Sequence, residues 1–218
     1  MNVEGDPAAR AELERLGVPG LPAVAVDGRV VHGWNPAEYA RLLGVRYEER
    51  EKLPPAELAR RLDVVLEAAE RLIRALPDAA LDVKPPQRDR TIRDLGYHVF
   101  RLSLAFIDAM DRNELPESWL HETAPPSIGD AHALAAYGAL VRARLAGWFE
   151  ATPASEYARI VPVYYGPQQA HELLERTTWH AAQHLRQLYD LAARCGVTPP
   201  QPMPAAALEG LPLPAALW

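Results

Sequence analysis

Apolar residues recur at spacings of three and four in four long segments of this 218-residue chain. This spacing is typical of helices that bury one face and expose the other. The four segments cover residues 55–76, 91–110, 130–151 and 167–195. Because each helix has to bury its apolar stripe against another, the pattern predicts an antiparallel four-helix bundle over residues 54–196.

The first 48 residues follow a different pattern. A proline after Asp6, the turn pair Asp27-Gly28 and a proline after Asn35 predict the order helix, strand, strand, helix. The expected strands are 21–26 and 29–32, with a further extended piece at 161–165. A unit of this size buries too little surface to be stable alone, so we expect it to pack on the rest of the chain or on a partner.

The fold class expected for the whole chain is mainly α, with a small α/β segment before the bundle. The expected division is 1–48, 54–196 and a tail over 197–218. The tail is rich in proline and alanine, and we expect it to wrap the surface. Its large apolar residues are expected to dock there: Leu211, Leu213 and Trp218.

Composition argues against several classes of function. The chain has 23 Lys+Arg against 29 Asp+Glu, and a net charge of -6 disfavours a nucleic-acid-binding surface. The single cysteine, Cys195, excludes an intrachain disulfide, a CxxC redox pair and a cysteine-rich zinc site. No apolar run approaches the roughly 18 residues of a membrane span. The acidic residues 1–10 lack the regions of a signal peptide, so we expect a cytoplasmic protein without nucleic-acid or membrane partners.

Three of the seven histidines fall where a metal site can form. His180 and His184 are four positions apart on the last predicted helix, so both imidazoles project from one face. His98 lies in the apolar stripe of the second predicted helix and therefore also points into the bundle. Three neutral imidazoles with one open position make a divalent-metal site. The alternative is that His98 is a core histidine with satisfied hydrogen bonds and that the pair binds nothing.

The residues beside these histidines narrow the chemistry. The insert Ala181-Ala182-Gln183 lacks the glutamate of His-Glu-x-x-His, which disfavours a zinc protease of that type. Gln187 lies on the face of His180 and His184, where it either orients a ligand imidazole or acts as a buried capping partner. Asp94, four residues before His98, could accept that ring's second N–H, although helix capping is the simpler explanation. No residue beyond the metal site is identified as a catalytic acid or base.

Two segments of the chain resemble a known family. Both segments resemble the DinB-like superfamily. The first is Thr91-Ile-Arg-Asp-Leu-Gly-Tyr-His98, and the second runs from Glu172 to Gln187 and contains His180-Ala-Ala-Gln-His184-Leu-Arg-Gln187. The resemblance covers about residues 54–196. It implies that His98, His180 and His184 are ligands of a divalent metal, commonly zinc or nickel. The family includes S-transferases and isomerases that use bacillithiol, mycothiol or glutathione, with the thiol activated at the metal.

The N-terminal segment resembles the second half of a glutaredoxin. The family has a strand that opens with a cis-proline, and the similar segment here is Val18-Pro-Gly-Leu-Pro22-Ala-Val-Ala-Val, with Pro22 at the proline position. The family also has a glycine turn before its last helix, and the similar segment here is Gly33-Trp34-Asn35-Pro36. The CxxC helix is absent, so redox exchange is not available. The resemblance implies a thiol-binding role for Leu21, Pro22, Gly33 and Asn35. A remnant that only packs or dimerises is the alternative.

Two functional hypotheses follow. The first is a metal-dependent transferase or isomerase that transfers a low-molecular-weight thiol to a small electrophile, the thiol being activated at the three-histidine site. The second is a non-catalytic metal- or ligand-binding module whose N-terminal segment mediates dimerisation. Both are compatible with a homodimer, which we expect because the small N-terminal segment needs a surface to cover it.

Overall fold

The computed structural model describes residues 6–18, 22–33, 35–48, 50–86 and 89–218. The chain divides into two compact units, one made of Met1–Glu51 with Pro162–Pro167, the other of Lys52–Val161 with Gln168–Trp218. Most described residues are helical, and the strands form two short antiparallel hairpins. Among the described residues, no helix is both long and apolar enough to cross a bilayer.

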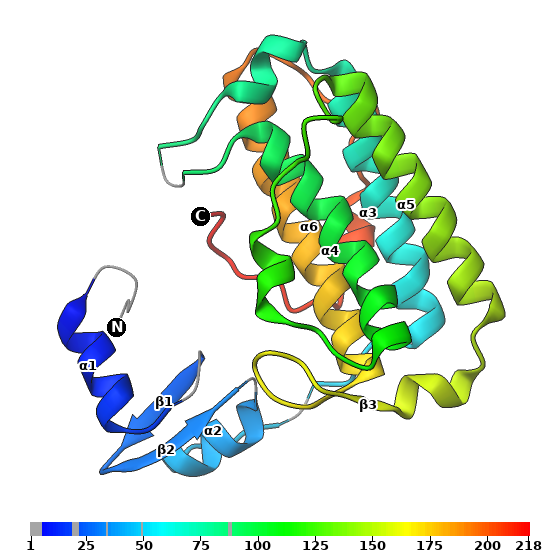
Figure 1. Cartoon of the computed structure of the whole chain (residues 1–218). Coiled ribbons are helices and arrows are strands. Elements are labelled where there is room, and N and C mark those ends of the chain that lie inside the picture. Colours follow the sequence, from blue (N-terminus) through cyan, green and yellow to red (C-terminus); the bar gives the residue numbers. More distant parts are fainter. Residues whose placement is uncertain (1–5, 19–21, 34, 49, 87–88) are drawn as a thin grey trace. The chain divides into compact units, whose positions relative to one another are not determined.

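The larger unit is a bundle of four long helices (Figure 1). They are α3 (Pro55–Ala75), α4 (Ile92–Arg112), α5 (Ala131–Ala151) and α6 (Ala170–Arg194). The apolar stripes seen in the sequence form its core, and the largest fully buried side chains include Leu62, Phe100, Phe106, Leu134 and Leu173. The prediction of four helices at these positions is therefore confirmed.

The order of the helices around the bundle is not the order along the chain. Helices α3 and α4 each pack mainly against α5 and α6, so α3 faces α4 across one diagonal. Arg93, at the start of α4, donates to the carbonyl of Ile128 just before α5, at 3.1 Å. The two helices therefore begin at the same end and run in the same direction, as the colours of Figure 1 also show.

The prediction of an antiparallel bundle is consequently wrong in part. Helix α3 starts beside the start of α6, where His171 Nε2 lies 2.8 Å from the carbonyl oxygen of Leu53. Helices α3 and α6 thus run one way, and α4 and α5 run the other (Figure 1). The neighbours α3/α5 and α4/α6 are antiparallel, while α3/α6 and α4/α5 are parallel. A parallel pair needs a long return connection, which residues 113–130 supply.

The return connection between α4 and α5 is held along the outer side of α4. It contains the 3-10 helix η2 (Glu117–His121). Arg101 pairs with Glu122, and its guanidinium also lies 5.1 Å from the centre of the Trp119 ring. The backbone N–H of Ala124 donates to Asp94 Oδ1 at 3.1 Å. These contacts, made by polar residues of α4, direct the chain back to the end of the bundle where α4 begins.

Capping residues define where the bundle helices begin. Thr91 Oγ1 accepts from the N–H of Asp94 at 3.0 Å, which is the predicted start of α4. Asp130 Oδ1 accepts from the N–H of Ala133 at 2.7 Å and starts α5 in the same way. Gln169 and Glu172 form a capping box at the start of α6.

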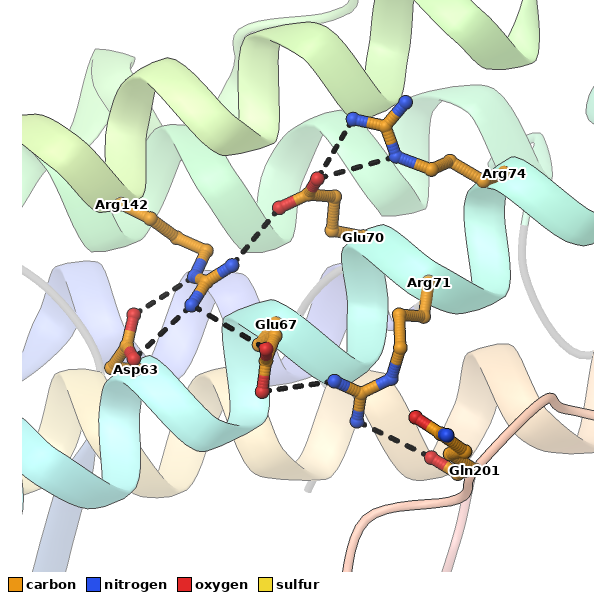
Figure 2. A network of polar contacts seen from close by, with 7 residues as sticks. All are labelled: Asp63, Glu67, Glu70, Arg71, Arg74, Arg142 and Gln201. Carbon is orange, nitrogen blue, oxygen red and sulfur yellow. Dashed lines mark hydrogen bonds and ion pairs between the residues drawn. The ribbon is translucent and has the colours of Figure 1, made fainter.

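An ion-pair network joins α3 to α5 and to the tail (Figure 2). Arg142 of α5 pairs with Asp63 at 2.8 Å and with Glu70 at 3.1 Å, both on α3. Arg71 of α3 pairs with Glu67 at 2.9 Å and donates to the backbone carbonyl of Gln201 at 3.3 Å. The second contact shows that residues of the tail lie along the bundle.

The smaller unit contains α1 (Pro7–Arg15), β1 (Ala23–Val26), β2 (Arg29–His32) and α2 (Pro36–Leu43). The two strands pair antiparallel with Ala23 opposite His32, which confirms the hairpin. Asp27 and Gly28 both have positive φ, at 49° and 77°, as the two-residue turn requires. Gly33 is also constrained, because a Cβ there would lie 2.1 Å from the carbonyl oxygen of Tyr165.

Two expected strands are shorter than predicted. The piece predicted over 161–165 is strand only at β3 (Ile160–Val161), which pairs with β4 (Gln168–Gln169). Beyond it the chain turns, with the N–H of Gly166 bonded to the carbonyl of Val163 at 2.9 Å. The first strand of the N-terminal hairpin begins at Ala23, and Leu21 lies outside the described residues.

Candidate metal centre

Three histidines from two neighbouring helices meet in the bundle. His98 comes from α4, two turns after its capped start, and His180 and His184 come from one face of α6. His98 and His184 are each only 5% exposed, and His180 is half-buried. One nitrogen from each ring can be chosen so that all three lie within 4.8 Å of one another. The structure therefore brings together the three histidines that the sequence singled out.

The spacing of the ring nitrogens suits one ion. The Nε2 atoms of His180 and His184 are 3.1 Å apart. Two nitrogens that bind one tetrahedral ion at 2.0–2.1 Å are about 3.3 Å apart, so this pair needs little movement to share a metal. The ring of His98 lies edge-on to His184, with centres 5.0 Å apart, and closes the third side.

The electrostatic surroundings keep His180 neutral. Burial lowers the pKa of His180 well below its usual range, and the positive charges that His184, His98, Arg176 and Arg90 carry or gain act in the same direction. Neutral imidazole is the form that has a free lone pair for a metal. A donor set of three imidazole nitrogens fits a borderline divalent ion such as zinc or nickel.

Gln187 contacts His184 directly. Its Oε1 lies 2.6 Å from His184 Nδ1, so the ring nitrogen donates and the amide oxygen accepts. This leaves the lone pair on His184 Nε2, which faces His180. Of the two interpretations of Gln187 open from the sequence, this contact favours the orientation of a ligand imidazole.

Asp94 is engaged at the start of α4. One carboxylate oxygen accepts from Thr91 Oγ1 at 2.8 Å, and the other accepts from the N–H of Ala124 at 3.1 Å. These are the contacts of a residue that caps a helix and anchors the return connection. They favour the capping interpretation of Asp94 over a contact with His98.

Two features near the site were missed in the sequence. Arg176 and Arg90 both act on His180 electrostatically. Arg176 could have been found from the sequence, because it is four residues before His180 and so lies on the same helix face. The second feature is the backbone carbonyl of Leu217, which accepts from Gln187 Nε2 at 2.7 Å. A backbone carbonyl has no sequence signature, so no pattern could have revealed it.

The other candidate binding residues lie in the smaller unit. The N–H of Gly33 donates to the carbonyl of Pro22 at 2.9 Å, just beyond the paired ends of the hairpin. Asn35 Oδ1 accepts from the N–H of Glu38 at 3.1 Å and so starts α2. Tyr39 donates its hydroxyl to the carbonyl of Gly33. Leu21, the fourth candidate, lies outside the described residues.

Comparisons with known proteins agree on the bundle. A family model described as the DinB superfamily matches residues 61–188. A DinB-like protein from Bacillus cereus superposes with a TM-score of 0.55 at 14% identity, over 66% of this chain and 93% of that one. YfiT from Bacillus subtilis, described as a probable metal-dependent hydrolase with an unusual four-helix bundle topology, gives 0.54 at 16% identity, over 71% and 96%. No curated protein matches. At these identities the two structures establish the fold alone.

Proposed function

This chain belongs to the DinB superfamily, and on that premise we propose that it is a divalent-metal enzyme whose ligands are His98, His180 and His184. The observation that carries the proposal is the convergence of three imidazoles from α4 and α6 on one point inside the bundle. Three protein ligands leave a coordination position open, which is the arrangement of catalytic rather than structural zinc sites.

We propose a low-molecular-weight thiol as the group that is activated there. A bound divalent ion would supply Lewis acidity and would lower the pKa of a thiol. Arg176 and Arg90 add positive charge near His180, and such a field favours an anionic thiolate over a neutral ligand. The thiolate would then attack a small electrophile, so the reaction is a transfer or an isomerisation.

The N-terminal unit is proposed to contribute to thiol binding or to dimerisation. The β1–β2 hairpin and α2 are what the second half of a glutaredoxin would retain. The backbone around Pro22 and Gly33 would then be the part of this unit that contacts a thiol. If the unit instead mediates a homodimer, deletion of residues 1–45 yields a monomer that still binds metal.

Hydrolysis is the second candidate, and the description of YfiT as a probable metal-dependent hydrolase favours it. The same three-histidine site could activate water instead of a thiol. The two reactions differ in one requirement, because only the transferase needs an added thiol. Turnover of an activated ester without thiol would therefore support hydrolysis.

Metal analysis followed by activity assays tests the proposal. The purified chain is expected to bind one zinc or nickel ion, and His180→Ala to lose it. His132→Ala is the matched control, since His132 is exposed on α5 and is not part of the cluster of three histidines. The metal-loaded protein should conjugate bacillithiol, mycothiol or glutathione to 1-chloro-2,4-dinitrobenzene. A wild-type chain that takes up no divalent ion would refute the proposed site.

A further inference from the structure

The tail after α6 is attached to the bundle through its backbone carbonyls. Side chains of α3 and α6 donate hydrogen bonds to backbone carbonyls of the tail. These bonds are Arg61 to Ala206 at 3.0 Å, Arg71 to Gln201 at 3.3 Å, Arg186 to Pro214 at 3.0 Å, Gln183 to Ala216 at 3.1 Å and Gln187 to Leu217 at 2.7 Å. Gln187, the last of these donors, also contacts His184.

The bond to Leu217 determines which end of the Gln187 amide faces His184. A carbonyl oxygen can only accept, so the NH₂ group of Gln187 has to point at the tail. The amide oxygen then points at His184 Nδ1, 2.6 Å away. A hydrogen on Nδ1 leaves Nε2 as the nitrogen with the lone pair. The tail therefore determines, through one amide, which nitrogen of His184 is available to a metal.

We propose that the tail is a working part of the metal centre, with the carbonyl of Leu217 and the side chain of Gln187 as positioning groups for His184. The inference rests on the proposed function, because it assumes that His184, held by Gln187 and Leu217, binds a metal. Gln183 Nε2 donates to the same carbonyl at 2.8 Å, and Trp218 Nε1 donates to Asp190 at 3.2 Å. These two bonds hold Leu217 against α6 independently of Gln187.

Loss of the tail carbonyl would remove this control. The amide of Gln187 could then rotate and present its NH₂ group to His184. Nδ1 would have to accept, the hydrogen would move to Nε2, and that nitrogen could no longer bind a metal. Loss of a partner that orients a ligand histidine typically weakens metal binding about 10–100-fold, and we expect about tenfold here because only part of the population would rearrange.

The test compares the full chain with a chain truncated after Ala215, which lacks the carbonyl of Leu217. Zinc affinity is measured by competition with a chelating dye. Histidine tautomers are measured in the metal-free proteins by ¹⁵N NMR of histidine-labelled samples. We expect His184 of the full chain to be in the Nδ1–H form, and the truncated chain to show a mixture of both forms and about tenfold weaker zinc binding. An unchanged tautomer with zinc affinity within twofold of the full chain overturns the inference.

Two point variants keep the result interpretable. Arg71→Met is the matched control, because it removes a side-chain bond to the same tail at Gln201, 16 residues before Leu217, and should leave both measurements unchanged. Gln187→Met decides the case if the truncated chain does not fold: about tenfold weaker zinc binding supports the inference, and full affinity overturns it. If the full chain binds no zinc, the proposed function fails, while the tautomer measurement still decides whether the tail positions His184.

Discussion

The metal-free protein should lose stability in acid through one identifiable residue. His180 has a pKa well below its usual range because it is partly removed from solvent and lies beside two other histidines. In the unfolded chain the same side chain titrates near 6.5. Below that pH the unfolded state takes up a proton that the folded state does not, so unfolding becomes more favourable as the pH falls. The effect is absent above pH 7.5.

The size of this loss follows from linkage. One pH unit below the unfolded pKa, a histidine that stays neutral in the folded state destabilises it by about 1.4 kcal/mol, and by about 0.1 kcal/mol or less at pH 7.5. The assay is urea unfolding followed by circular dichroism, in a chelator, at pH 7.5 and pH 5.5. His180→Gln removes the titrating group. Between pH 7.5 and pH 5.5 the free energy of unfolding of the variant should therefore fall by about 1.4 kcal/mol less than that of the wild type.

Ionisable groups that do not interact with His180 are common to both proteins and cancel in the comparison. His132→Gln is the control, because it makes the same substitution at an exposed histidine outside the cluster. Equal pH dependence of the wild type and of His180→Gln would refute the reasoning, since it would mean that His180 is protonated in the folded state at pH 5.5.

Three further predictions concern the metal and the packing. Saturating zinc, at a thousandfold its Kd, should raise the free energy of unfolding by about 4 kcal/mol, and His98→Ala should abolish this in thermal melts with and without chelator. Arg142→Met should lower the free energy of unfolding by about 1–2 kcal/mol at low salt and by less in 1 M NaCl, because it removes the ion pairs with Asp63 and Glu70. An equal loss at both salt concentrations would contradict an ionic origin. Gly33→Ala should expose residues 22–43 to limited proteolysis, because its Cβ has no room beside Tyr165 and φ there is positive; wild-type resistance would show that the loop adapts.

The helices and the three clustered histidines could be predicted from the sequence for a local reason. Amphipathic spacing depends only on residues within a few turns, and so does the placement of His180 and His184 on one face. The starts of α4 and α5 were also visible, because Thr91 and Asp130 act on N–H groups three residues away. Even His98 could be placed on an inward face from the stripe of its own helix.

The direction of the helices was not readable, and the antiparallel prediction failed there. Four amphipathic helices can bury their stripes in several connection orders, and periodicity does not distinguish them. What selects the observed order is the return connection between α4 and α5, held by Arg93, Asp94 and Arg101. Along the sequence these residues are ordinary polar positions on a helix surface, since their partners are 21 to 35 residues away.

Local patterns along the chain were therefore enough to predict the four helices, the N-terminal hairpin and the three histidines. Long-range packing set how these elements meet: the parallel and antiparallel pairs, the approach of His98 to α6, and the contact of Leu217 with Gln187. The two groups of features differ in the range of the interactions behind them. Helix formation and capping are satisfied within a few residues, whereas the three histidines come together only where α4 packs against α6, and Gln187 meets a backbone carbonyl 30 residues away along the chain.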